Sequence, residues 1–173
     1  SVTILHSAAH DHPTLREHRI AVGLYDHAPD GIVRRRRVEV DVRGERTDVP
    51  ELEGEQQPDL LLLNDDDLTF TKVRLDERSR QTVVRGIGRI SSSLARALCW
   101  TAATDMLRDA ELPARDYVEL VLAGVERESD VSVVQTVLAA ARMAIHQYAD
   151  PQDRLMLLAL WASALRRMAG TAE

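Results

Sequence analysis

The spacing of apolar side chains changes once along this sequence, near Leu75. Before that point, apolar and polar residues alternate with a period of two, as in the run EHRIAVGLYD at 17–26. Beyond it, apolar residues recur every three or four positions, as in the stretch 94–106. The first pattern is typical of half-buried strands and the second of amphipathic helices. We therefore expect an α+β protein in which the strands come first and the helices follow.

The first part, residues 1–75, is predicted to be a small antiparallel β-sandwich. A second alternating run, IVRRRRVEVDVRG at 32–44, follows the first one. Turn-forming residues lie at 27–31 and at 49–58. Strands that succeed one another about every ten residues, with such turns between them, suit an antiparallel sandwich.

The second part, residues 76–173, is predicted to be an all-α domain of five helices. Candidate N-terminal caps occur at Ser91 to Ser93 and at Asp130, where short polar side chains precede helical patterns. Short connections favour helical hairpins stacked as in an α-solenoid. The last helix, about 153–168, is apolar on most sides, so we expect it to be largely buried.

Composition narrows the class of protein. The 173 residues are 45% hydrophobic and 29% charged, with a net charge of -6, which is typical of a soluble globular protein without a general attraction to nucleic acid or anionic lipid. Cys99 is the only cysteine, so no internal disulfide forms and a cytoplasmic location is expected. The apolar run at 155–165 is too short to span a bilayer, and no signal sequence is visible. The chain opens at Ser1 on a strand-like run without a methionine, which indicates a piece of a longer polypeptide.

Three consecutive aspartates, Asp65 to Asp67, are the first candidates for chemistry. They lie between an apolar run at 60–63 and a strand-like run at 68–75. A calcium loop of the EF-hand type spaces its carboxylates at alternate positions around a glycine, and NDDD offers neither feature. Asn and Asp commonly form turns by bonding their own backbone. We therefore predict a polar turn between two strands.

Three histidines, His6, His10 and His12, are close enough in sequence to suggest a metal site. A zinc site also needs hydrogen-bond partners that orient the ligating side chains, and the chain contains no H-E-x-x-H motif. Surface histidines in a loop are the more common case. The arginine run, Arg34 to Arg37, cannot form one compact phosphate site, because successive strand residues point to opposite faces. We expect a solvated strand or ion pairs with another domain.

The remaining candidates also favour structural roles. Gly86 and Gly88 lack the third glycine of a dinucleotide fingerprint and are interpreted as a bend between helices. Cys99 is expected to be a buried, inert thiol, and His146, without a second ligand nearby, to be structural. Surface ion pairing is predicted for a group of acids and arginines: Asp105, Asp109, Glu111, Arg108 and Arg115. The chain's own residues therefore predict no catalytic, cofactor-binding or metal-binding residue.

Long segments of the sequence resemble a known enzyme family. The run PDLLLLNDDDLTFTKVRLDERS at 58–79 and the stretch from ISSSLARALCW to SVVQTVL at 90–138 closely resemble the C-terminal half of actinobacterial aminopeptidase N. The preceding runs at 17–26 and 36–44 are similar to the small β-sandwich domain of that family. The resemblance covers most of the chain.

The resemblance implies a place within a larger enzyme. Members of this family are zinc metallopeptidases that release N-terminal amino acids from peptides, and a helical C-terminal domain caps their active-site chamber. Their zinc ligands lie in H-E-x-x-H and their substrate amine site in G-x-M-E-N, and this sequence contains neither motif. The chain is thus expected to be non-catalytic. It would shape the substrate chamber and pack on the catalytic domain, while zinc would belong to the parent enzyme.

A second interpretation places the chain outside any enzyme. A free-standing module of sandwich and helices would bind a peptide or protein in a helical groove, as many solenoids do. In either case neither nucleic acid nor membrane is expected as a partner. An isolated fragment would also expose surfaces that normally meet other domains, so self-association is expected.

Overall fold

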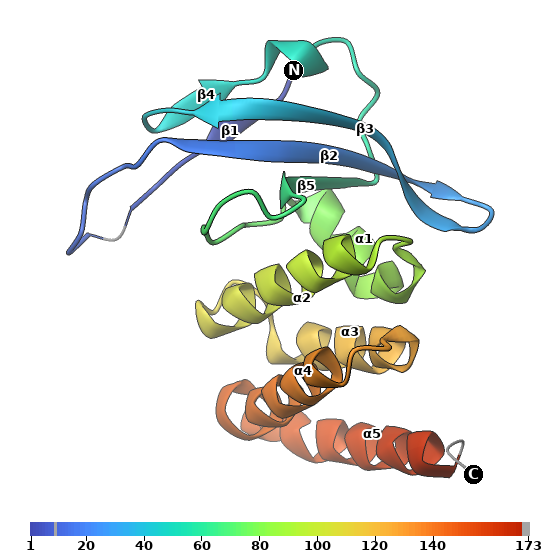
Figure 1. The fold of residues 1–173 in the computed structure, drawn as a ribbon. Coiled ribbons are helices and arrows are strands. Elements are labelled where there is room, and N and C mark those ends of the chain that lie inside the picture. The colour runs from blue at the N-terminus through green and yellow to red at the C-terminus, as the bar shows by residue number, and fades with distance from the viewer. Residues whose placement is uncertain (9, 171–173) are drawn as a thin grey trace.

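The computed structural model describes residues 1–8 and 10–170 and shows strands followed by helices (Figure 1). The strands are β1 (Thr3–Leu5), β2 (His18–Ala28), β3 (Gly31–Val42), β4 (Arg46–Asp48) and β5 (Leu60–Asp65). The α-helices are α1 (Glu77–Gly86), α2 (Ser93–Arg108), α3 (Ala114–Gly124), α4 (Val131–Met143) and α5 (Pro151–Gly170). A π-helical turn, η4 (Ala144–Tyr148), joins α4 to α5. The α+β class is confirmed.

The strands form two antiparallel sheets that pack face to face. Strands β3, β2 and β5 form one sheet in that order, and β1 pairs with β4 in the other. The alternation at 17–26 is confirmed, because Ile20, Val22 and Leu24 lie in the core between the sheets. The other members of this core come from β1, β3 and the segment after β4: Ile4, Val40, Val42, Val49 and Leu52.

The three-stranded sheet is buried on its second face as well. Tyr25, Ile32, Leu60 and Leu62 belong to the hydrophobic core of the helices, not to the core of the sandwich. Figure 1 shows this sheet as the middle layer, with β1 and β4 on one side and the helices on the other. One core therefore crosses the border expected at residue 75, and that border stays a prediction.

The helices stack in two rows, as an α-solenoid does. Helices α1, α3 and α5 pack side by side in one row, and α2 packs beside α4 in the other. Helix α3 touches the four other α-helices, and Tyr117, Val118, Leu120 and Val121 on it are completely buried. The predicted caps are confirmed, since Ser92 accepts a hydrogen bond from the Ala95 amide and Asp130 accepts from two amides of α4.

A glycine allows two corners of the stack to approach closely. A Cβ atom on Gly124, the last residue of α3, would lie 2.3 Å from the Ile87 side chain and 3.0 Å from the Trp100 ring. Gly88 lies beside Gly124, and a Cβ atom on Gly88 would lie 2.9 Å from the Arg127 side chain. The predicted bend at Gly86 and Gly88 is confirmed, because α1 ends there and a short 3-10 turn leads towards α2.

Two expectations are wrong. Residues 66–76 form an irregular loop instead of the second strand expected at 68–75. The cause is the left-handed backbone at Asp66 and Asp67, which turns the chain out of the sheet.

Helix α5 is not largely buried. Its buried residues are Leu157, Trp161 and Ala164, whereas four large apolar side chains are between 38% and 79% exposed: Leu155, Met156, Leu160 and Leu165. Its outer face has no neighbour within the residues that the structure describes, since an end helix packs on one side only.

A buried carboxylate, Asp65, lies on the face of β5 that meets the helices. Its oxygens accept hydrogen bonds from the Tyr25 hydroxyl at 2.9 and 3.1 Å and form an ion pair with Arg34 at 2.8 Å. Gly23 makes room for it, because a Cβ there would lie 2.2 Å from an Asp65 oxygen. Burial, followed by the charge of Asp65, raises the pKa of Tyr25, so this hydroxyl keeps its proton and donates a hydrogen bond to the carboxylate.

We expect Asp65→Ala to lower the free energy of unfolding by about 2–3 kcal/mol. The substitution leaves the buried Tyr25 hydroxyl unpaired and removes one partner of Arg34, whose side chain is 36% exposed and therefore partly solvated. Urea denaturation followed by circular dichroism measures the loss. Asp41→Ala is the control, since it removes an exposed ion pair with Arg19 that contributes less than about 1 kcal/mol. Equal losses in the two variants would contradict a special role for Asp65.

Candidate functional site at the seam between sheet and helices

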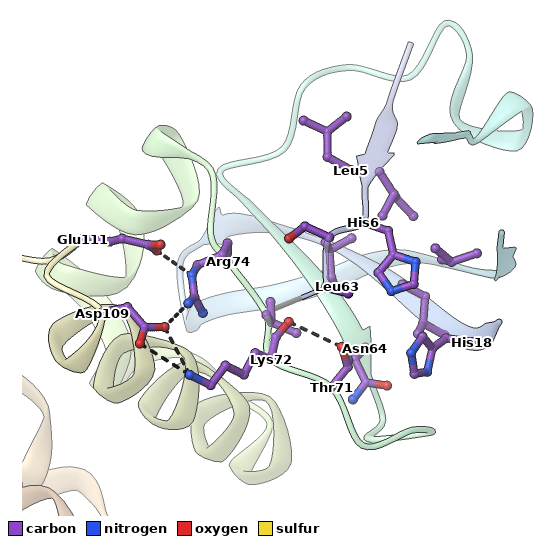
Figure 2. Close-up of a pocket in the computed structure, with 16 residues that line it drawn as sticks. Leu5, His6, His18, Leu63, Asn64, Thr71, Lys72, Arg74, Asp109 and Glu111 are labelled. Atoms are coloured by element: carbon purple, nitrogen blue, oxygen red, sulfur yellow. Dashed lines mark hydrogen bonds and ion pairs between the residues drawn. The ribbon is translucent and has the colours of Figure 1, made fainter. Parts of the chain in front are cut away.

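A hollow lined by charged residues and histidines lies where the sandwich meets the turn between α2 and α3 (Figure 2). Its volume is about 630 Å³. Strands β1, β2 and β5 supply one wall, and the loop before α1 together with the α2–α3 turn supplies the other. The polar side chains in its lining are His6, Ser7, His18, Asn64, Thr71, Lys72, Arg74, Asp109 and Glu111.

One wall of the hollow is a compact group of paired charges. The Lys72 ammonium lies 3.2 Å from an Asp109 oxygen, and Arg74 contacts both Asp109 and Glu111. Figure 2 shows Arg74 between the two acids. The hydrogen bond from Lys72 is the main cause that lowers the pKa of Asp109. The predicted pairing of the acids is confirmed for Asp109 and Glu111, but their partners come from the loop before α1 and not from Arg108 or Arg115.

The opposite wall holds two imidazoles in edge-to-face contact. The rings of His6 and His18 are 5.4 Å apart between centroids, at 71°. His6 Nδ1 lies 3.2 Å from the Gly44 carbonyl oxygen, and His18 Nδ1 lies 3.0 Å from the Thr69 hydroxyl. The sequence analysis missed His18, because nothing in a linear pattern relates it to His6. Its place at the start of an alternating strand was the only available signal.

The charged and imidazole groups of the hollow are already paired with local partners. Its cations and carboxylates neutralise one another, and each imidazole already uses one ring nitrogen on a local partner. A hydrolytic site of the familiar kind needs a nucleophile next to a base that a third group orients. The described lining residues do not form such a set.

The aspartate run divides into two roles. Asn64, Asp66 and Asp67 have left-handed backbone, with φ of 54°, 66° and 54°, so the predicted turn is confirmed for them. Asp65 is different, because it ends β5 and is buried under the sheet. Hydrogen bonds from Arg34 and then Arg37 lower the pKa of Asp66, which keeps this carboxylate charged.

The histidines do not gather as their spacing suggests. His6 contacts His18, while His10 and His12 are exposed. Within residues 1–8 and 10–170, no three His, Cys, Asp or Glu side chains are grouped so that they could hold a metal ion. The donor set described here therefore does not fit a zinc ion. That the chain has no metal or catalytic residue stays a prediction.

The four arginines of β3 are neutralised by acids of the same β-sandwich region. Arg34 pairs with Asp65 and Asp66, and Arg37 with Glu39 and Asp66. Arg35 pairs with Asp26 and Glu55, and Arg36 pairs with Glu55. A β-bulge between Leu24 and Tyr25 adds one residue to β3 here, so Arg34 lies opposite Tyr25 and on the same face as Asp65. The arginines thus form ion pairs within this region, and pairing with another domain stays a prediction.

The last two candidates, His146 and Cys99, lie away from the hollow described above. His146 is exposed on the π-helical turn and lines a shallow hollow with Arg142, so it does not pack in the core as a structural residue would. Cys99 is completely buried in α2, as expected. Burial, with a smaller contribution from Asp65, raises the pKa of the Cys99 thiol to about 12.

We expect Cys99 to be unreactive in the folded chain. A buried thiol with so high a pKa offers almost no thiolate to a disulfide reagent at pH 8. Ellman's reagent measures this by absorbance, and it should detect one thiol per chain only after unfolding in guanidinium. Fast reaction of the folded chain would contradict the buried position.

No helix within the described residues is both long and apolar enough to cross a membrane.

Comparison with known proteins agrees with the fold and with the resemblance seen in the sequence. The profile of the ERAP1-like C-terminal domain matches residues 60–173. Aminopeptidase N from Streptomyces lividans is 53% identical over 161 residues, which cover 92% of this chain and 19% of the relative. The chain thus spans about a fifth of the length of the curated relative that it matches. The resemblance to an actinobacterial aminopeptidase N is confirmed, and the chain belongs to the ERAP1-like C-terminal domain family.

Proposed function

We propose that this chain is a non-catalytic part of a zinc-dependent aminopeptidase N, which releases N-terminal amino acids from peptides. Its sandwich and helices pack on the catalytic domain and form part of the wall of the substrate chamber. The observation that carries this proposal is the identity of 53% across 92% of the chain. The zinc ion is held by another part of that polypeptide, and a cytoplasmic location is consistent with the single cysteine.

A hybrid enzyme tests this function. The matched segment of the Streptomyces lividans aminopeptidase N is replaced by the corresponding residues of this chain. We expect the hybrid to hydrolyse an aminoacyl fluorophore at a rate within about tenfold of the relative, a barrier difference of about 1.4 kcal/mol. The isolated chain should show no turnover, even with added zinc. A folded hybrid without activity, or metal-dependent turnover by the pure isolated chain, would refute the proposal.

A free-standing binding module is the second candidate. The observation that favours it is a groove of about 330 Å³ between α2 and α4. Trp100, Thr104, Val133 and Val137 line it, together with one acid and one base, Asp105 and Arg108. The gene separates the two candidates: an open frame upstream of Ser1 that encodes H-E-x-x-H supports the enzyme, whereas a start codon near Ser1 supports the module.

The outer face of α5 supports a further part of the proposal, self-association of the isolated chain. Leu155 is 79% exposed, and Met156 and Leu160 are 40% and 43% exposed on the same helix. Several apolar side chains on one exposed helix favour contact with a second copy when no other domain covers them.

We expect Leu155→Glu to shift the isolated chain towards the monomer, because it places a charge in the middle of that apolar face. Gln152→Glu is the matched control, since it adds the same charge at an exposed polar position of α5. Sedimentation velocity over a range of concentrations gives the fraction of dimer. The proposal of self-association through this face is wrong if the unsubstituted chain is already monomeric at high concentration, or if both variants dissociate equally.

A further inference from the structure

The only phenylalanine of the chain points into solvent. Phe70 lies in the loop after β5 and is 101% exposed, and Leu68 in the same loop is 45% exposed. Burying a phenylalanine side chain stabilises a fold by about 1.5–3 kcal/mol, so a fully exposed one leaves that stabilisation unused. Single exposed apolar residues are common, and Phe70 is informative only because of how its loop is held.

Hydrogen bonds hold the loop on both sides of Leu68. The Asn64 side chain donates to the Thr69 carbonyl oxygen at 2.8 Å and accepts from the Thr69 amide at 3.2 Å. The Asp67 amide donates to the Asn64 carbonyl oxygen at 2.9 Å. His18 of β2 contacts the Thr69 hydroxyl at 3.0 Å. The residue directly before Phe70 is therefore fixed to the sheet.

The loop also keeps an unfavourable backbone. Asn64, Asp66 and Asp67 adopt left-handed conformations, with φ of 54°, 66° and 54°. Such conformations cost free energy in residues other than glycine and persist where the surroundings fix them. Here Arg34 and Arg37 hold the Asp66 carboxylate. The loop thus keeps a strained backbone that its neighbours support, and in this conformation the Phe70 side chain projects into solvent.

An apolar recess lies directly beside Phe70. Its volume is about 220 Å³, and Phe70 is one of its lining residues. Its other apolar lining residues are Leu62, Leu63, Val73, Leu98 and Ala102, and its polar ones are Asn64, Asp67, Thr69, Thr71 and Thr101. A projecting aromatic ring next to a recess is the arrangement found at the centre of protein interfaces, where a few large side chains supply most of the affinity.

The remainder of the same polypeptide is the best occupant for this surface. The chain corresponds to 19% of the length of its relative, so most of that polypeptide lies outside the residues described here. A covalently linked domain meets the surface at high effective concentration, so one aromatic anchor and a small recess are sufficient. A separate protein would need a larger interface, of about 1,000 Å² or more.

We propose that the loop bearing Leu68 and Phe70 is a docking anchor for the rest of the aminopeptidase polypeptide. Phe70 enters an apolar recess of that neighbouring part, and an apolar side chain of the neighbour fills the recess to which Val73 and Leu98 contribute half-buried side chains. This inference rests on the proposed function and adds to it the surface through which the chain meets its parent.

Photo-crosslinking in the hybrid enzyme tests the anchor. Phe70 is replaced by p-benzoylphenylalanine, the hybrid is irradiated, and the cross-linked peptides are identified by mass spectrometry. We expect a cross-link to a segment outside the transplanted residues of the same molecule. A cross-link only within the transplanted segment, to a second copy or to an added peptide substrate, or the absence of any cross-link, would overturn the proposal.

Stability measurements give a second, independent result. Phe70→Ser should lower the melting temperature of the hybrid and leave that of the isolated chain unchanged, because the ring is fully exposed in the isolated chain. Phe70→Leu is the control and should keep most of the hybrid's stability. An equal change of melting temperature in both proteins, or no change in the hybrid, would contradict docking through Phe70. Activity of the unmodified hybrid reports separately on the proposed function, so the two failures are distinguishable.

Discussion

The burial of strands β2 and β5 on both faces of the three-stranded sheet is the constraint on which the rest of the structure depends. One face packs on β1 and β4, and the other shares a core with the helices through Tyr25, Leu60 and Leu62. A strand buried on both sides leaves little place for a charge, and Asp65 is the exception. Its ion pair with Arg34 and its hydrogen bonds from Tyr25 satisfy the carboxylate without water. The two parts of the chain are thereby joined by packing as well as by sequence.

The same end of β5 determines the surface that the molecule presents. Once Asp65 is anchored, the left-handed residues that follow carry the chain out of the sheet and hold Phe70 in solvent. The chain then returns along the seam, where Lys72 and Arg74 meet Asp109 from the α2–α3 turn. One short acidic run therefore connects the core, the projecting loop and the hollow between the sheet and the helices.

Local patterns predicted local structure well. The alternation of Ile20, Val22 and Leu24 identified a strand, and Ser92 and Asp130 marked helix starts, because neighbours in sequence decide both features. Features that join distant residues were not predictable. The burial of Asp65 requires the missing Cβ of Gly23, and Lys72 pairs with Asp109 across 37 positions. The exposure of α5 was missed because an apolar helix shows the same pattern whether or not a neighbour covers it.

An experimental structure of the Streptomyces lividans aminopeptidase N with a bound peptide analogue tests the central claim most directly. The account predicts that the segment matching this chain forms the sandwich and the two helical rows, and that the side chain equivalent to Phe70 is buried against another domain. It also predicts that this segment supplies no ligand to the metal and no group to the scissile bond. A side chain of the segment bound to the metal ion would contradict the account.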